Sequence, residues 1–431
     1  MRLFHAAVIA AAALGPPGAG ATPAGLVLPL PYATPSAVRV ARVVGWPAGV
    51  TPRAPPNFRV EAYARGLDNP RSLLVLPNGD VVVAEARGAS PPGAKRPSAD
   101  RVVLLRASAG SSVADQQFVL VDGIHLPFGL ALRRDRLYIG AADAVHACPF
   151  LVGRTRLAGP CRTIVDLPDD DGGGHWTRSL AFSPDESQLY IGVGSRTNAD
   201  EEHLDAKVPE RAAILTARLD GKGHRIYASG LRNPAGLAIE PASGVLWATV
   251  SERDLLGDEL VPDFLTSVRD GAFYGWPYSY FGAHEDPRKR GERPDLVARA
   301  AVPDFALDSH VTPLGLAFYG RDRFPPSHRG AAFIALHGSW NHSTLVGYKV
   351  VFVPFANGRP AGPAEDFLTG FIKDADANEV YGRPAGVAVT TDGALLVADD
   401  GGDTIWRVTF HCGACTPDPV PPAKRAGKSA R

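Results

Sequence analysis

Polar side chains that could bind an anion and accept a proton recur at one position of a repeated pattern. In the stretch from Gly230 to Glu259, a turn containing Arg232 and Asn233 precedes one apolar run, and a charged loop follows a second apolar run. Short apolar runs bounded by turn residues indicate strands. Because a hairpin reverses direction once, the turn and the loop lie at the same edge of the predicted hairpin. The sequence therefore predicts that these basic and acidic side chains crowd one spot.

The same pattern occurs six times along the chain. The copies align on one apolar position each, at Leu73, Leu130, Leu180, Leu237, Leu316 and Val387. Six repeats of about four short strands predict an all-β fold, a six-bladed β-propeller of four-stranded blades. The sixth copy has three strands of its own, and the N-terminal segment 58–64 supplies the fourth, which closes the ring. A β-sandwich is the alternative fold, but it would not explain six matched copies.

The turn before the first strand of each copy, the leading turn, carries cations or imidazoles. These are Arg71, His125, His175 with Arg178, Arg232 with Asn233, His310, and Arg383. The loops after the second strands, the exit loops, carry Glu85 with Arg87, Asp143, Ser195 with Asn198, Glu252 with Asp254, His337 with Trp340 and Asn341, and Asp399 with Asp400.

A ring of like charges is costly unless a ligand of opposite charge sits among them. Arginine binds carboxylates and phosphates through two parallel hydrogen bonds. The leading turns therefore predict a site for an anion with several such groups. The alternative is that each arginine pairs with an acid of a neighbouring exit loop.

Two further patterns suggest a base and a metal site. His175 follows three glycines, which allow a ligand to approach the backbone, and its ordinary pKa suits a general base. A structural histidine is the alternative. Glu252, Asp254 and Asp258 could bind calcium through carboxylate oxygens. The acids at 169–171 could do the same, but a solvated acidic turn explains them better because they lack EF-hand spacing.

Composition and the two ends of the chain predict an exported protein. The chain has 45 basic and 45 acidic residues, so nothing suggests a nucleic-acid partner. Residues 1–21 have one early positive charge, a short apolar core and an A-x-A site, which describe a signal peptide. The apolar core is too short to span a bilayer, although a retained anchor is the alternative. We expect a periplasmic or secreted protein with no membrane span.

The remaining boundaries follow from composition. Residues 22–56 form a Pro/Ala-rich leader that is expected to be loose, residues 57–411 form the propeller domain, and residues 412–431 contain a C-x-x-C pair and a disordered tail. Cys148 and Cys161 lie 13 residues apart and could pair, as could Cys412 and Cys415. A disulfide within or between these pairs is favoured over a haem or zinc site.

Seven segments between about Asn57 and Phe410 carry a resemblance to a known family. They are GGGHWTRSLAFSPD, LYIGVGSRTN, RAAILTARLDG, SGLRNPAGLA, SERDLLGDELVPDFLTSVRDGAFYGWPYSYFG, LHGSWNHSTLVGYKVVFVPF and GRPAGVAVTTDGALLVADDGGDTIWRV. In these segments the chain resembles the L-sorbosone dehydrogenase and soluble quinoprotein glucose dehydrogenase family, in its sorbosone-type branch. The chain departs from the glucose enzymes at Ala235, where those have Gln, and in the loop HGSWN, where those have a quinone-binding Lys.

The resemblance implies a six-bladed propeller that binds pyrroloquinoline quinone (PQQ), a tricarboxylate, together with Ca²⁺. It implies oxidation of a sugar or a sugar-derived alcohol or aldehyde by hydride transfer to the quinone, with a periplasmic electron acceptor as partner. We accordingly predict His175 and Arg232 as catalytic residues. The predicted cofactor ligands are Arg178, Arg232, Asn233, Arg383, His125, His337 and Trp340, and the predicted calcium ligands are Glu252, Asp254 and Asp258. The alternative function is a propeller without redox chemistry, either a sugar-binding protein or a calcium-dependent lactonase.

Overall fold

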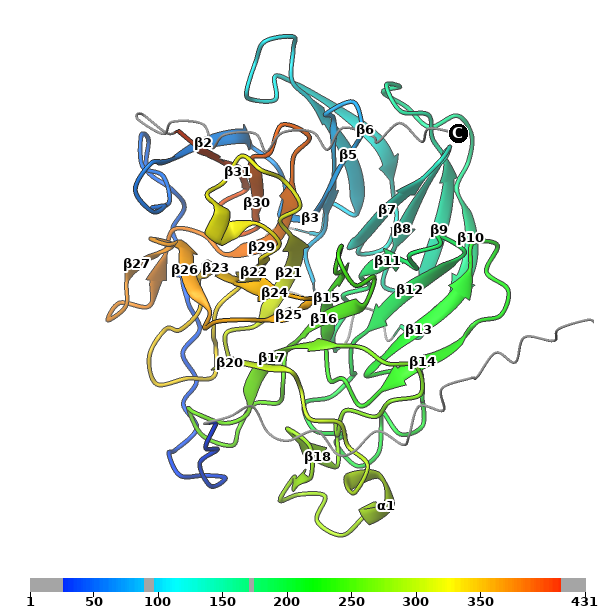
Figure 1. Cartoon of the computed structure of the whole chain (residues 1–431), viewed down its shortest axis with the longest axis vertical. Coiled ribbons are helices and arrows are strands. Elements are labelled where there is room, and N and C mark those ends of the chain that lie inside the picture. The colour runs from blue at the N-terminus through cyan, green and yellow to red at the C-terminus, as the bar shows by residue number, and fades with distance from the viewer. Residues whose placement is uncertain (1–25, 89–96, 170–173, 412–431) are drawn as a thin grey trace, which may run out of the picture.

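The protein is built almost entirely of β-strands. The computed structural model describes residues 26–88, 97–169 and 174–411 (Figure 1). Within these ranges, helix is confined to α1 (Pro294–Val297) and a 3-10 turn, η1 (Pro326–His328). The rest of the regular structure in these ranges is six antiparallel four-stranded sheets, one small three-stranded sheet and two short strand pairs. The predicted all-β class is therefore confirmed.

Three four-stranded sheets form from the first half of the described chain, each from consecutive strands. The first contains β3 (Pro70–Val75), β4 (Val81–Glu85), β5 (Arg101–Arg106) and β6 (Gln116–Asp122). The second contains β7 (Gly129–Arg133), β8 (Arg136–Gly140), β9 (Ala144–Pro149) and β10 (Arg162–Asp166). The third contains β11 (Leu180–Phe182), β12 (Gln188–Val193), β13 (Ala213–Arg218) and β14 (Arg225–Ser229).

Three more four-stranded sheets form from the second half of the described chain. The fourth sheet contains β15 (Pro234–Ile239), β16 (Leu246–Val250), β17 (Pro262–Ser267) and β20 (Phe305–Ser309). The fifth contains β21 (Pro313–Phe318), β22 (Ala332–Leu336), β23 (Lys349–Val353) and β26 (Glu365–Leu368). The sixth contains β29 (Pro384–Val389), β30 (Leu395–Asp399), β31 (Thr404–Phe410) and, paired to β31, the early strand β2 (Phe58–Arg65).

The remaining strands are short. They are β1 (Arg42–Val43) with β28 (Glu379–Val380) and β27 (Ile372–Asp374), β18 (Ser279–Tyr280) with β19 (His284–Glu285), and β24 (Phe355–Ala356) with β25 (Arg359–Pro360).

Neighbouring sheets pack face to face through apolar cores. The second strand of each sheet is mostly apolar and buried on both faces, as in β4 and β22, because a sheet lies on either side of it. Each sheet shares a core with the next one along the chain, and the sixth shares one with the first, where Val81 and Val83 meet Leu396 and Ile405. Burial of these side chains supplies the main driving force for folding.

The first strands of the six sheets surround a cavity of about 110 Å³. Its lining takes a short segment from each of β3, β7, β11, β15, β21 and β29. Glycine is required where these strands approach one another: a Cβ on Gly236 would lie 2.4 Å from the carbonyl oxygen of Leu314.

The described part of the leader is bound to the sheets and is not loose. β1 pairs in parallel with β28, and Arg53 pairs with Thr369 (Figure 1). Proline lacks a donor but leaves the neighbouring N–H groups free to form these bonds. No helix among the described residues has the length and apolar composition needed to cross a membrane. The predicted signal peptide, the C-x-x-C pair and Asp170 and Asp171 lie outside the described residues.

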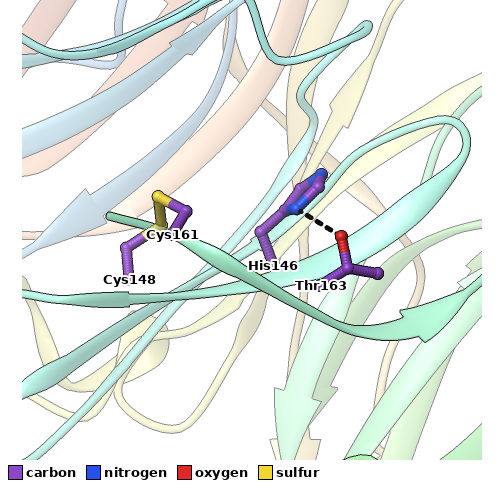
Figure 2. The surroundings of a disulfide bond; sticks show 4 residues. All are labelled: His146, Cys148, Cys161 and Thr163. Carbon is purple, nitrogen blue, oxygen red and sulfur yellow. Dashed lines mark hydrogen bonds between the residues drawn. A yellow bond between two sulfur atoms is a disulfide. The ribbon is translucent and has the colours of Figure 1, made fainter. Parts of the chain in front are cut away.

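One predicted cysteine pair is present. Cys148 on β9 and Cys161, just before β10, form a disulfide beside His146 and Thr163 (Figure 2). The bond closes a loop with a sequence separation of 13 residues.

We expect the variant with Ser at both Cys148 and Cys161 to lose about 2–3 kcal/mol of unfolding free energy, because the loop gains freedom in the unfolded chain. Urea denaturation of both proteins measures the difference. A reducing agent should destabilise the wild type and leave the double variant unchanged. Equal stability of oxidised wild type and variant would contradict the prediction.

Candidate active site

The leading turns and exit loops meet at one edge of the sheets, as the hairpin pattern predicts. The register pairs Pro70 with Glu85, Pro234 with Val250, and Pro384 with Asp399, so each turn lies beside the exit loop of its own sheet. Contacts between sheets then join these turns and loops into two groups of polar side chains.

The first group is centred on His175. Its Nδ1 lies 2.9 Å from the carbonyl oxygen of Ser195 and 3.0 Å from that residue's Oγ. A carbonyl only accepts, so Nδ1 carries the proton and Nε2 keeps its lone pair. Burial, followed by the charge of Arg232, lowers the pKa of His175 to about 3. His175 is therefore a neutral imidazole at neutral pH.

A close approach brings His175 and Asn233 together. A Cβ on Gly194 would lie 2.4 Å from the Cβ of His175 and 2.5 Å from Oδ1 of Asn233. Only glycine leaves room for both side chains here. Asn233 also accepts a hydrogen bond of 2.7 Å from Thr177, which fixes its amide oxygen.

Arg232 forms hydrogen bonds to both the third and the fourth exit loop. It donates to the carbonyl oxygens of Ser251 (3.3 Å) and Glu252 (2.6 Å). It also donates to the carbonyl and side-chain oxygens of Asn198 at 3.0 and 3.1 Å, and to Asp254 at 3.5 Å. Each nitrogen of the guanidinium thus has at least one acceptor. The side chain is rigidly held, and it carries a buried positive charge next to His175.

The three predicted calcium ligands have other partners. Asp254 bonds to His310 at 3.1 Å as well as to Arg232, and Asp258 accepts from the backbone N–H of Ser343 at 3.0 Å. Burial raises the pKa of Glu252 to about 7. In the part of the chain that the structure describes, no three His, Cys, Asp or Glu side chains are grouped closely enough to hold a metal ion. The assignment of these ligands stays a prediction.

Sequence reasoning missed Asp263, a buried carboxylate of β17. It accepts hydrogen bonds of 2.7 Å from the backbone N–H groups of Glu252 and Thr312, and burial raises its pKa to about 7. It therefore joins the fourth exit loop to the fifth leading turn. An acid inside the apolar run of a strand was the signal available in the sequence.

The second group is centred on Asp400. This carboxylate forms an ion pair with Arg71 and accepts from Nε2 of His337 at 2.8 Å. Burial would raise the pKa of Asp400, but His337 and Arg71 outweigh it and hold the pKa far below its usual range. Burial, followed by Arg383, lowers the pKa of His337 to about 4. Asp400 and Arg71 were not among the predicted ligands, although both lie in the leading turns and exit loops.

Aromatic and backbone contacts hold the second group against the first. The guanidinium of Arg71 lies 4.9 Å from the ring centre of Trp176, the neighbour of His175. Arg383 donates to the carbonyl oxygens of His337 (3.2 Å) and Gly338 (3.0 Å). Cations stacked on aromatic rings gain electrostatic attraction from the ring face.

Three further predicted cofactor ligands, Arg178, His125 and Trp340, have these surroundings. Arg178 is fully buried and donates to the carbonyl oxygens of His175, Thr177 and Pro168, so it supports the turn that carries His175. His125 lies 3.2 Å from Asp169. Trp340 is 41% exposed. Their role as ligands stays a prediction.

Comparisons with known proteins agree with this fold. An uncharacterized protein of Borreliella burgdorferi is 27% identical over 68% of this chain and 78% of its own length. The aldose sugar dehydrogenase YliI of Escherichia coli is 26% identical over 63% of this chain and 76% of its own length.

Two solved structures have the same fold at 20% sequence identity and a TM-score of 0.68. One is the Trichoderma reesei protein of Carbohydrate-Active Enzymes Family AA12, with 84% of this chain and 98% of that chain covered. The other is the PQQ domain of pyranose dehydrogenase from Coprinopsis cinerea, with 86% and 100% covered. The sequence profile of the TrAA12-like family matches residues 52–261 and 291–411, so the chain belongs to the TrAA12-like family.

Proposed function

We propose that the protein is a PQQ-dependent dehydrogenase that oxidises a sugar or a sugar-derived alcohol or aldehyde. The observation that carries the proposal is the orientation of the His175 imidazole, whose Nδ1 donates to Ser195 and whose Nε2 makes no hydrogen bond within the described residues, so Nε2 can accept a proton. The pKa of about 3 makes this imidazole a weaker base than an ordinary histidine, and a ligand anion beside Arg232 would raise that pKa. This base stands beside the buried cation Arg232. The sugar dehydrogenases among the relatives and similar structures support the substrate class, and the sorbosone-type resemblance supports a sorbosone-like aldehyde or alcohol.

The proposal includes a six-bladed propeller closed by β2. It is supported by the six four-stranded sheets of the described chain, by the shared core between each sheet and the next, and by the pairing of β2 with β31. The cavity lined by all six first strands lies where the axis of such a ring would run. Closure of the ring would leave no exposed sheet edge within a blade.

The residues present fit an anionic quinone. Nε of Arg71 and Oγ of Ser251 are buried polar atoms without a hydrogen-bond partner in the described part of the chain. Such atoms are rare unless a ligand or water satisfies them. With Arg383 and Asn233 they form a set of donors suited to carboxylate and carbonyl oxygens. We therefore add Arg71 and Ser251 to the predicted ligands Arg232, Asn233, Arg383 and His337.

The chain's own residues would activate the substrate. When bound, PQQ supplies the acceptor for the two electrons that leave the substrate. Nε2 of His175 takes the hydroxyl proton, and Ser195 keeps the imidazole in the tautomer that leaves Nε2 free to accept it. The guanidinium of Arg232, held in place by its hydrogen bond to Glu252, would stabilise negative charge that develops in the site during the reaction. Because His175 and Arg232 are already held in position, their side chains need not reorganise during the reaction.

Calcium is part of the proposal through the resemblance and through a calcium structure of the Trichoderma reesei AA12 protein. Glu252, Asp254 and Asp258 do not converge among the described residues, so we derive no step through the ion.

Adding PQQ and Ca²⁺ to the purified protein tests the proposal. We expect a higher melting temperature, because a ligand that binds only the folded state stabilises it by about 2.7 kcal/mol at a hundred times its dissociation constant. Dye reduction across a panel of aldoses and aldehydes then identifies the substrate. No thermal shift and no dye reduction would contradict the proposal, and hydrolysis of a lactone with calcium alone would favour the alternative.

We also propose export to the periplasm or beyond, supported by the sequence of residues 1–21. N-terminal sequencing of the native protein should find a mature end near Thr22. An intact Met1 on the purified native protein would contradict cleavage.

A further inference from the structure

The leader segment 26–46 runs along three of the loops that carry predicted site residues. We name it the strap. The family profile begins at residue 52, so the strap lies outside the matched part of the chain. Leu26 and Leu28, at the start of the strap, pack against the core between the third and fourth sheets. In Figure 1 the blue trace follows one side of the molecule up to β2.

The strap first holds the fourth exit loop, residues 251–259. The backbone N–H of Tyr32 donates to Leu256 at 2.7 Å, and Oγ1 of Thr34 accepts from the backbone N–H of Asp258 at 2.8 Å. The two segments touch closely: a Cβ on Gly257, which has φ of +113°, would lie 2.9 Å from Oγ1 of Thr34. All three predicted calcium ligands, Glu252, Asp254 and Asp258, lie in this loop.

The strap then holds the fifth exit loop, residues 337–348, and joins it to the fourth. The side chain of Asn341 donates to the carbonyl oxygen of Ala37 and accepts from the N–H of Leu255, both at 2.8 Å. The N–H of Arg39 donates to the carbonyl oxygen of Trp340 at 2.7 Å. One buried amide, that of Asn341, therefore bonds to both the strap and the neighbouring loop.

The strap finally reaches the sixth leading turn through a buried carboxylate. Nε1 of Trp46 donates to Asp399 at 2.6 Å, and the indole stacks on Tyr381 with ring centres 5.0 Å apart. The other oxygen of Asp399 accepts from the backbone N–H groups of Arg383 (2.7 Å) and Gly402 (2.8 Å). Nε1 of Trp406 donates to the same oxygen as Trp46, at 3.1 Å, so the two indoles together fix the carboxylate that fixes the backbone of Arg383.

We propose that the strap positions the site: Thr34 sets the fourth exit loop, and Trp46 sets Arg383 through Asp399. The proposal rests on the proposed function for its effect on ligands, while its effect on the loops can be measured without any ligand. Thr34 and Trp46 are positioning residues, because neither belongs to the groups around His175 and Asp400. Each acts on a different loop, so their substitutions should have separate effects.

The first test measures amide hydrogen exchange of the full-length protein without ligands. We expect Thr34→Val, which keeps the shape and removes the acceptor, to speed exchange at Asp258 by about two- to tenfold, the scale of one net hydrogen bond. Thr34→Ser should restore the wild-type rate. Trp46→Phe should speed exchange at Arg383 and Gly402 and leave Asp258 unchanged. Val40→Ala, at an exposed strap residue, is the matched control and should change none of these amides.

The second test measures ligand affinity. We expect Trp46→Phe to weaken PQQ binding about two- to tenfold and Thr34→Val to leave it unchanged. Unchanged exchange in both variants, or an equal rise in all six sheets, would overturn the strap proposal. If the wild type binds neither PQQ nor Ca²⁺, the proposed function fails, and the exchange rates still decide whether the strap positions the loops.

Discussion

His175→Ala should lower turnover by about 10²–10⁴ and leave PQQ binding largely intact, the usual scale for a lost general base. The reason is that Nε2 is the acceptor for the hydroxyl proton, while the imidazole is held by Ser195. The loss should appear in kcat and kcat/KM together, since the proton moves in the transition state. Turnover, PQQ affinity and melting temperature are measured on the same protein. His411→Ala, at an exposed residue after β31, is the matched control and should keep full turnover.

If His175 has only a structural role, the His175→Ala protein should instead have a lower melting temperature and unchanged turnover per folded molecule. NMR titration of the histidine rings adds an independent check. Because burial and Arg232 hold the pKa of His175 at about 3, its ring should stay neutral at pH 5. A ring that titrates near pH 6.5 would contradict the assigned environment.

The depressed pKa also affects stability. An unfolded histidine binds a proton near pH 6.5, whereas folded His175 does so only near 3. Its contribution to stability is therefore complete above pH 6.5 and is lost as pH falls toward 3. His337, with a pKa of about 4, acts in the same direction. His175→Ala should consequently lose less stability than the wild type on acidification from pH 6.5.

Arg232→Ala should weaken PQQ binding by about 2–5 kcal/mol if the guanidinium pairs with a buried ligand anion. The structure adds a second expectation. Removing the side chain leaves the carbonyl oxygen of Glu252 without its 2.6 Å donor and removes a buried cation from Asp254. Breaking such a pair typically costs about 3–5 kcal/mol, so the protein without ligands should be less stable as well.

Urea denaturation without PQQ separates these two effects. Arg225→Ala is the matched control, because Arg225 forms a half-exposed pair with Asp270 and should contribute at most about 1 kcal/mol. Arg232→Lys keeps the charge but loses the planar fork, so it should recover part of the PQQ affinity and little of the stability. Unchanged PQQ affinity in a folded Arg232→Ala protein would remove Arg232 from the cofactor site.

The sequence by itself determined the strand content and the shared edge of the turns and loops. Apart from β2, each sheet takes its strands in chain order, and the first two strands of each sheet form a hairpin. Such hairpins depend on local apolar runs and on turn residues such as Pro241 and Gly244. Because the copies share one local pattern, each folds into the same kind of hairpin. Residues at the same position of the pattern therefore lie at the same edge of their sheets. His175, Arg232 and Arg383 were found in this way.

Only the tertiary structure decided which partner each side chain takes. The sequence offers several possible acceptors for Arg232. In the structure its N–H groups donate to Asn198, Glu252 and Asp254, which lie on two different loops. Asp258, a predicted calcium ligand, accepts a hydrogen bond from Ser343, 85 residues away.

The bond from Trp46 to Asp399 joins residues 353 positions apart, in a segment expected to be loose. Such choices depend on how loops of different sheets pack to within a fraction of an ångström, because a hydrogen bond weakens steeply outside a narrow range of distance and angle. The local sequence pattern carries no information on how loops of different sheets pack against one another.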